Sequence, residues 1–216
     1  FVLRAKCKLS DASADWPLWG LLSPLEQEEG KRWSLRREGE GFQIRLPDAP
    51  GLARSLLAQP AAAAPPALPA LPALAQADWQ WHEVEAGLAW VRAATSEQFV
   101  PQMINLEQLE GVNFQKGCYP GQEVVARSQY RGTIKRRTLM FAAAGEEAQI
   151  GQEIFHSADP EQPAGLVAAV AAREGQVLLL AEVKLAATEG GSLHLGRADG
   201  PLLQPRALPY TISAAE

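Results

Sequence analysis

A run of alanine, proline and leucine from Pro60 to Pro72 limits the possible folds more than any other feature of the sequence. Repeated prolines remove backbone donors, so this run can neither continue a helix nor lie inside a hydrogen-bonded sheet. Such a composition favours an extended linker. The length of 216 residues allows one large domain or two small ones, and a linker at this place favours two. We therefore expect a domain over residues 1–59, a linker over 60–76, and further domains beyond it.

The segment before the linker predicts a small α+β domain. Alternation over Phe1–Leu9 indicates a half-buried strand that places Cys7 on its apolar side. Further strand-like runs are Trp16–Leu22, Trp33–Arg37 and Phe42–Leu46, with a hairpin turn over 38–41 between the last two. Helix signals follow the potential cap at Ser23-Pro24 and cover Leu52–Ala58. Helices on one face of such a sheet would form a small ferredoxin-like piece.

The C-terminal part, residues 138–216, predicts an antiparallel β-barrel. Its strand-like runs are Thr138–Ala142, Gly165–Ala171, Gln176–Val183 and Leu193–Leu195. Glycine-containing turns such as Arg173-Glu174-Gly175 and Glu189-Gly190-Gly191 separate them. Short strands with such turns are typical of a small barrel.

Residues 77–137 form the central segment between these parts. A helix is expected over Trp79–Ala86 with Asp78 as its cap, and a short strand over Val112–Phe114. Ser96–Leu109 is irregular, and long irregular segments in compact domains are often functional. Three tryptophans, Trp79, Trp81 and Trp90, either fill a core or line a pocket for a flat ligand.

The most unusual stretch of the chain runs from Lys116 to Arg127. Two glycines flank Cys118, Tyr119 and Pro120, and glycine suits a backbone that turns tightly or is closely approached. We expect a loop over Lys116–Pro120 and a helix from Gly121 to about Ser128, since proline presets helical φ at a helix start. The free amides at the beginning of that helix suit an anion or a polar heterocycle.

Two alternatives remain open for the side chains of this stretch. Cys118 is either a small buried apolar residue or a functional thiol, whose thiolate Lys116 and the helix N-terminus would favour. Glu123 and Arg127 lie four residues apart on one helix face. They form either a surface ion pair, or a unit in which Glu123 orients Arg127 toward a ligand carboxylate.

Composition excludes several classes of protein. The net charge of −5 and the pI of about 5.4 give no support for a nucleic-acid binder. No apolar run is long enough to span a bilayer, and no signal-peptide pattern opens the chain. Two cysteines are too few for a disulfide framework, which fits a reducing cytoplasm. The three histidines are scattered, so no metal site is expected.

The central motif resembles the signature of the YgfZ family, which comprises folate-binding relatives of the glycine-cleavage T-protein, an aminomethyltransferase. The residues that carry the resemblance are Lys116-Gly117-Cys118-Tyr119, Gly121-Gln122-Glu123 and Ala126-Arg127. Further similar segments are Glu85-Ala86-Gly87, Phe99-Val100-Pro101-Gln102, Asn105-Leu106, Arg131-Gly132, Lys135-Arg136 and Leu208-Pro209-Tyr210. The resemblance thus extends over residues 79–210 and is loose over residues 1–59. It implies a T-protein-like architecture, and it leads us to expect that this chain lacks the family's N-terminal region.

The resemblance also implies a function and a site. It implies a tetrahydrofolate-binding protein that supports the assembly or repair of iron–sulfur clusters, with iron–sulfur proteins or assembly factors as partners, and thereby tRNA modification. Cys118 would be the functional thiol and Lys116 would tune it. The cofactor-binding residues would be Glu85, Gly117, Tyr119, Gly121, Gln122, Glu123 and Arg127. Among these, Glu85 matches a glutamate that resembles a pterin-contacting residue of the T-proteins.

Two alternative functions belong to other classes. A folate-dependent aminomethyl or one-carbon transferase would form product from a methylamine donor and tetrahydrofolate. An RNA-binding module would use the locally basic segment Tyr130–Arg137 and would bind with a steep dependence on salt. That segment is otherwise a solvated strand end or a seat for a glutamate tail.

Overall fold

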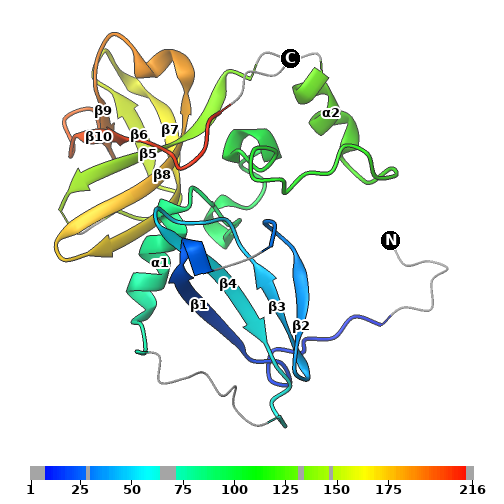
Figure 1. The fold of residues 1–216 in the computed structure, drawn as a ribbon. Helices are drawn as coiled ribbons and strands as arrows, with labels where there is room; N and C mark the ends of the chain where they lie inside the picture. Colours follow the sequence, from blue (N-terminus) through cyan, green and yellow to red (C-terminus); the bar gives the residue numbers. More distant parts are fainter. Residues whose placement is uncertain (1–7, 28–29, 64–71, 131–133, 146–147, 213–216) are drawn as a thin grey trace. The chain divides into compact units, whose positions relative to one another are not determined.

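The computed structural model of the chain describes residues 8–27, 30–63, 72–130, 134–145 and 148–212. The chain divides into two compact units (Figure 1). The N-terminal unit comprises residues 1–47 and 51–73, and the C-terminal unit comprises residues 48–50 and 74–216. The predicted strand at Phe1–Leu9 lies almost wholly outside the described residues.

The N-terminal unit is built on a four-stranded antiparallel sheet in the order β1-β4-β3-β2. The strands are β1 (Leu18–Pro24), β2 (Leu35–Glu38), β3 (Gly41–Arg45) and β4 (Leu52–Ala58). The predicted hairpin is confirmed, since β2 and β3 pair from Leu35 and Ile44 to Glu38 and Gly41. Arg54 of β4 is fully buried, and its guanidinium donates to the carbonyl of Pro47 at 3.3 Å.

Two predictions for this unit are wrong. Leu52–Ala58 is a strand and not a helix, because pairing with both β1 and β3 outweighs the helical preference of its leucines and alanines. Ser23 and Pro24 end β1 opposite β4 and cap no helix. Only the 3₁₀ turn η1 (Leu25–Gln27) follows them, so the described residues of this unit contain no helical layer of a ferredoxin-like piece.

The C-terminal unit contains a six-stranded antiparallel sheet in the order β10-β5-β8-β7-β6-β9. Its strands are β5 (Arg136–Ala144), β6 (Glu153–His156), β7 (Asp159–Arg173), β8 (Gln176–Lys184), β9 (Leu193–Leu195) and β10 (Leu203–Arg206). One antiparallel bridge, between His194 and Leu202, joins the two edges. The sheet thus curls toward closure, but β9 and β10 do not pair as strands, so it is a half-barrel. The four predicted strands are confirmed, whereas β6 and β10 were not predicted.

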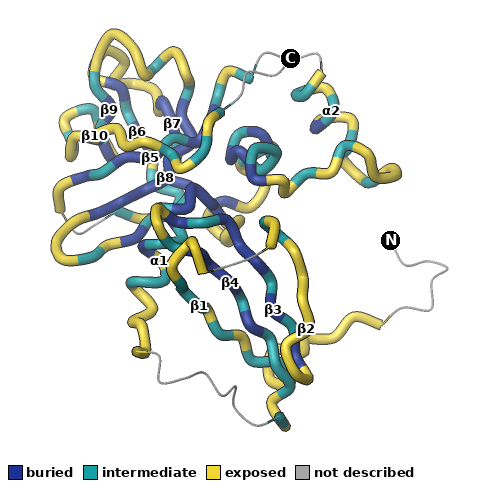
Figure 2. Tube along the Cα trace, viewed as in Figure 1, coloured by how far each residue is buried: buried dark blue, intermediate teal, exposed yellow. Residues whose placement is uncertain are grey.

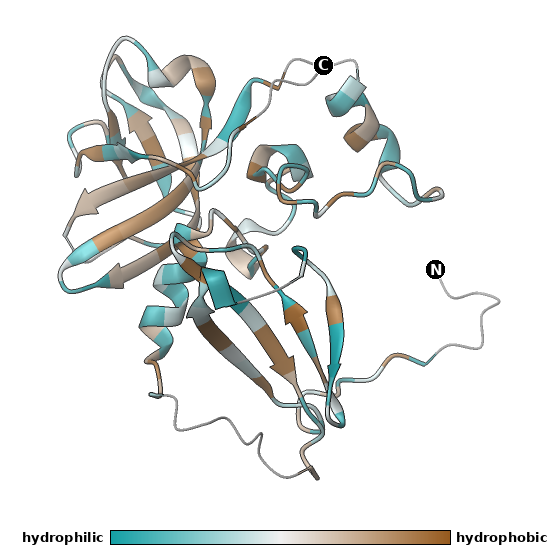
Figure 3. Cartoon of the chain, in the orientation of Figure 1, coloured by the Kyte–Doolittle hydropathy of each residue, from teal (hydrophilic) through white to brown (hydrophobic). Residues whose placement is uncertain are grey.

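Two hydrophobic cores cover the two faces of this sheet. Strand β8 is mostly hydrophobic and buried nearly throughout (Figures 2 and 3). Its successive residues Leu179 and Leu180 belong to different cores. The second core also contains Trp81 and Val84 of helix α1 (Gln76–Glu85). The sheet and α1 thus provide the base on which the remaining segments of the unit are held.

Further short elements connect these parts: 3₁₀ turns η2 (Ala93–Thr95), η3 (Pro101–Ile104) and η4 (Leu185–Thr188), and helix α2 (Gln122–Tyr130). The helix predicted over Trp79–Ala86 is confirmed as α1, although it starts earlier and Asp78 is not its cap. The strand predicted over Val112–Phe114 is not formed. Trp81 is a core residue, but Trp90 is 39% exposed and donates to Glu83 at 2.7 Å, so the tryptophans form no single cluster.

Candidate functional site

The cysteine signature folds as a loop that leads into helix α2, and the start of the loop contacts the end of that helix. The Asn113 side-chain oxygen accepts hydrogen bonds from the backbone N–H groups of Gln115 at 2.8 Å and Lys116 at 3.1 Å. Such a side-chain-to-backbone turn starts the loop. The ring of Phe114 meets the ring of Tyr130 edge to face, with centroids 6.0 Å apart, and so ties the start of the loop to the end of α2.

The loop ends at Gly121, which was expected to begin the helix and instead lies just before it. Gly121 has a φ of +80°, a value that glycine adopts without strain, and the next residue begins α2. The N–H of Gln122 closes the turn on the carbonyl of Tyr119 at 3.2 Å. The predicted loop followed by a helix is confirmed. Gly117, by contrast, has no positive φ and no atom near the position of a Cβ.

Cys118 lies on the outer side of this loop. Its side chain is exposed and forms no disulfide, which excludes the buried alternative. The Lys116 ammonium lies 4.5 Å from the centre of the Tyr119 ring, a cation–π contact that orders the turn around the cysteine. The loop therefore presents an accessible thiol next to a cation held on an aromatic face.

The surface ion pair between Glu123 and Arg127, one of the two alternatives for these residues, is not formed. Both side chains are exposed, and among the described residues neither has a partner within 4.0 Å. Arg127 instead lines a pocket of about 280 Å³ beside α2. The residues around this pocket are Val100, Gln102, Met103, Arg127, Ser128, Ile134, Lys135 and Arg136.

The pocket is positively charged. Arg136 is neutralised by Glu182, which receives its Nε–H and, at 2.7 Å, its Nη2–H. These hydrogen bonds raise the pKa of Arg136 above its ordinary value, against the opposing effect of burial. Arg127 and Lys135 form no ion pair within the described part of the chain, so their two charges are available to an anion.

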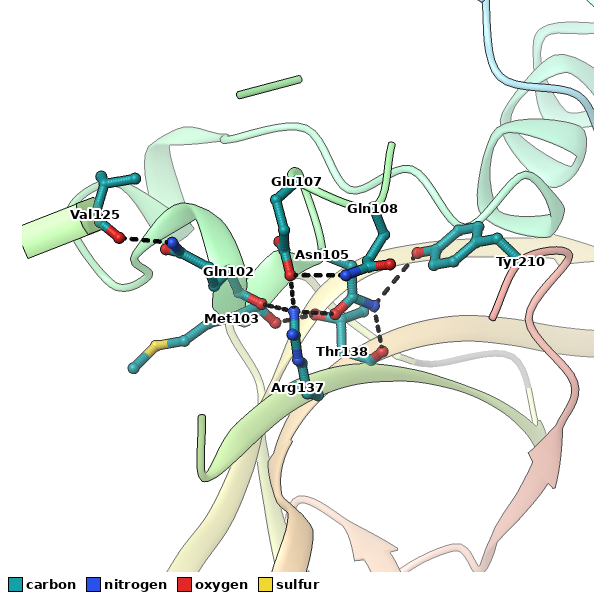
Figure 4. A network of polar contacts seen from close by, with 9 residues as sticks. All are labelled: Gln102, Met103, Asn105, Glu107, Gln108, Val125, Arg137, Thr138 and Tyr210. Carbon is teal, nitrogen blue, oxygen red and sulfur yellow. Dashed lines mark hydrogen bonds and ion pairs between the residues drawn. The ribbon is translucent and has the colours of Figure 1, made fainter. Parts of the chain in front are cut away.

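Gln102, which also lines this pocket, carries a buried polar atom without a hydrogen-bond partner among the described residues. The side chain is fully buried, and its amide N–H donates to the carbonyl of Val125 in α2 at 2.8 Å (Figure 4). Its Oε1 oxygen accepts no hydrogen bond from any described residue. Because buried acceptors are usually paired, this oxygen suits a ligand N–H or an ordered water.

Behind the pocket lies a buried polar network centred on Arg137 (Figure 4). Arg137 and Glu107 form an ion pair in which each side chain is 4% exposed. The same guanidinium nitrogen donates to the carbonyl of Gln102 at 2.8 Å and contacts the side-chain oxygen of Asn105 at 3.4 Å. The network thus fixes η3, which carries Gln102, to strand β5.

Tyr210 extends this network to the end of the chain. Its hydroxyl donates to the carbonyl of Gly87 at 2.8 Å and accepts from the Asn105 amide at 3.3 Å, while that amide also donates to Thr138 at 2.7 Å. Gly87 has a φ of +70°, and a Cβ there would lie 2.5 Å from the Tyr210 ring. The sequence assigned no role to Asn105 or Tyr210 and placed Arg137 in a basic surface segment. The signal for this network was that four of the segments behind the resemblance, those with Gly87, Gln102, Asn105 and Tyr210, meet here.

Glu85 and the basic segment are placed differently from the signature loop. The Glu85 carboxylate pairs with the Nδ1 atom of His82 at 2.8 Å at the end of α1, and no interaction among the described residues joins it to the cysteine loop. In the basic segment, Arg131 lies outside the described residues, and Arg136 and Arg137 are both paired with carboxylates. That pairing leaves little free charge for RNA phosphates.

No helix in the described ranges is long and apolar enough to cross a membrane. The same residues hold no group of three or more histidine, cysteine or acidic side chains that could bind a metal ion.

Comparison with known proteins found similar sequences. No family model matches the chain. It is 36% identical over 137 residues to proteins named tRNA-modifying protein YgfZ from Escherichia coli O7:K1, E. coli K12 strain DH10B and Shigella boydii serotype 18. These residues are 62% of this chain, but the match covers only 42% of each relative. The chain is therefore similar to YgfZ proteins over less than half of their length, in agreement with the resemblance of its cysteine signature to that family.

Proposed function

We propose that this chain is a tetrahydrofolate-binding, cytoplasmic protein that supports iron–sulfur cluster assembly or repair and thereby tRNA modification. The name of its relatives supports the link to tRNA modification, and the resemblance of the cysteine signature supports the folate and cluster roles. One observation carries the proposal. The exposed thiol of Cys118 lies just before helix α2, and Arg127 of α2 lines a pocket in which neither Arg127 nor Lys135 pairs with a described carboxylate.

The pocket fits one part of a folate. Its volume of about 280 Å³ lies just below the range of pockets that enclose whole drug-sized ligands. It suits a carboxylate-bearing glutamate tail, whose charges Arg127 and Lys135 would hold. The amide N–H that joins the tail to the benzoyl group would satisfy the Oε1 oxygen of Gln102. The pterin ring would then extend out of this pocket.

The residues of the chain have separate tasks in this proposal. Arg127 and Lys135 bind the anionic tail, and the network around Arg137 keeps Gln102 in place. Cys118 presents its sulfur at the surface, where a folate-borne group, a cluster or a partner protein can reach it. A bound folate would supply the one-carbon or redox chemistry of its pterin.

Calorimetric titration of the 216-residue chain with tetrahydrofolate tests the proposal. We expect micromolar binding that Arg127→Ala abolishes. Arg197→Ala is the matched control, because Arg197 is an exposed arginine of the same unit that pairs with Asp199 at 2.8 Å and does not line the pocket. Binding that survives Arg127→Ala would reject this pocket, and absence of binding by the unaltered chain would reject folate binding by this part of the protein.

A further inference from the structure

The half-barrel carries a second group of reactive side chains, well separated in sequence from the cysteine signature. Ser192 Oγ lies 2.8 Å from the Nε2 atom of His194 in β9. The Nδ1 atom of the same ring lies 2.8 Å from the carbonyl oxygen of Gly200. A hydroxyl, an imidazole and an orienting acceptor in this sequence of contacts form the arrangement of an activated serine nucleophile.

The contacts determine which atoms carry protons. A carbonyl oxygen can only accept, so the Nδ1 atom of His194 must carry the hydrogen directed at Gly200. In the neutral ring, Nε2 is then an acceptor, and the hydroxyl of Ser192 must donate to it. His194 is therefore held in the tautomer that a general base for this serine requires.

The backbone around the pair is also held in place. The N–H of Ser192 donates to the hydroxyl of Ser157 at 3.0 Å, and the N–H of Leu195 donates to the carbonyl of Pro201 at 2.9 Å. A Cβ at Gly200 would lie 2.1 Å from the carbonyl of Leu195, so only glycine allows the acceptor loop to approach β9 this closely. The serine, the imidazole and the carbonyl are thus positioned by neighbouring strands and turns.

An apolar pocket of about 390 Å³ adjoins the serine. Ser192 is one of its lining residues, and the others include Leu139, Phe141, Ala187, Leu193 and Leu203. Ser192 and His194 are both partly exposed, so solvent and a substrate can reach them. An acyl chain in the pocket would place its carbonyl at the hydroxyl, and the size falls within the range of small-molecule sites.

We propose that Ser192 and His194 form a serine esterase site for short apolar acyl esters. The Ser192 oxygen attacks the ester carbonyl carbon, and its proton passes to Nε2 of His194. The bond to the leaving alcohol breaks, and the alkoxide takes that proton. Water then gives a proton to Nε2 and attacks the acyl carbon; the carboxylic acid leaves, and the serine oxygen regains the proton.

The amides of Gly190 and Gly191 donate to no described residue, so they are available to the developing oxyanion.

Hydrolysis of p-nitrophenyl butyrate by the full chain is the first readout. We expect Ser192→Ala to abolish turnover and His194→Gln to lower it by about 100-fold or more, the usual contribution of a general base. Ser13→Ala is the serine control, because Ser13 is an exposed serine of the other unit, and it should leave the rate unchanged. Thermal unfolding of each variant separates a lost nucleophile from a lost fold.

Covalent labelling makes the test specific for the serine. A fluorophosphonate should add to Ser192, as located by peptide mass spectrometry, and His194→Gln should slow that reaction as it slows turnover. Absence of both hydrolysis and adduct in the unaltered chain would overturn the proposal. Hydrolysis that persists in Ser192→Ala would also overturn it, since it would come from another group on the protein.

Discussion

The buried network around Arg137 and the exposed loop around Cys118 lie within one unit, yet they are built in opposite ways. In the network, Arg137 and Glu107 are each 4% exposed, and the guanidinium meets a carboxylate, a carbonyl and an amide. In the loop, Lys116 and Cys118 are exposed, and the main contact between side chains is a cation over the Tyr119 ring. The first region holds segments together, whereas the second presents chemical groups to the outside.

This difference separates the residues behind the family resemblance into two kinds. Gly87, Gln102, Asn105 and Tyr210 support the structure, because their contacts join segments up to 123 residues apart. The residues from Lys116 to Arg127 have few such contacts and are free to meet a ligand or a partner. Substitutions should therefore affect stability in the first region and binding or reactivity in the second.

The largest effect is expected for Arg137→Met. Removing one partner of a buried ion pair leaves Glu107 charged without compensation, which should lower the free energy of unfolding by about 3–5 kcal/mol. Urea denaturation followed by tryptophan fluorescence measures the change. Arg127→Met is the matched control and should change stability by no more than about 0.5 kcal/mol, since Arg127 is exposed. If the two substitutions lowered the free energy of unfolding equally, the buried network would not differ from the exposed loop in its contribution to stability.

A smaller effect is expected for Tyr210→Phe. The ring and its packing against Gly87 are kept, but the carbonyl of Gly87 loses its donor. Leaving a buried acceptor unpaired costs about 1–3 kcal/mol. The same urea titration measures the loss, and hydrogen exchange of the Asn105 and Thr138 amides should show local loosening. If Tyr210→Phe left the free energy of unfolding unchanged, the hydroxyl would not contribute to the stability of the buried network.

The sequence predicted those parts of this fold whose signals are local. The strands at 138–142, 165–171, 176–183 and 193–195 were recognisable because apolar runs alternate with glycine turns. The loop and helix of the signature were recognisable because Pro120 and Gly121 mark the helix start. Leu52–Ala58 was misassigned because its composition favours a helix, and only its position between β1 and β3 makes it a strand.

The network around Arg137 could not be predicted for a different reason. Asn105 meets Tyr210 across 105 residues, and no local pattern distinguishes either residue from an exposed polar side chain. The sequence also placed Arg136 and Arg137 in a basic surface, whereas folding brings Glu182 and Glu107 to them. Long-range pairing determines burial and charge at these positions.

The contact between Lys116 and Tyr119 should contribute about 0.5–1 kcal/mol, the range for exposed cation–π pairs. A double-mutant cycle with Lys116→Met and Tyr119→Leu isolates this coupling. The same kind of cycle with Arg137→Met and Glu107→Gln should give a coupling several times larger, because that pair is buried. Similar couplings in the two cycles would contradict the contrast between the regions.

The smallest effect on stability is expected for Cys118→Ser. The side chain is exposed and forms no disulfide, so the free energy of unfolding should change by less than about 0.5 kcal/mol.

The effect of Cys118→Ser on thiol reactivity should be large. In the folded chain, iodoacetamide should modify Cys118 faster than Cys7, and the fast phase should vanish in Cys118→Ser. Because labelling of this thiol requires no unfolding, its rate should not follow the urea dependence of stability. Equal labelling of both cysteines, or a fast phase that remains in Cys118→Ser, would remove the evidence that the loop presents a functional thiol. A loss of stability comparable to that of Tyr210→Phe would place Cys118 among the supporting residues instead.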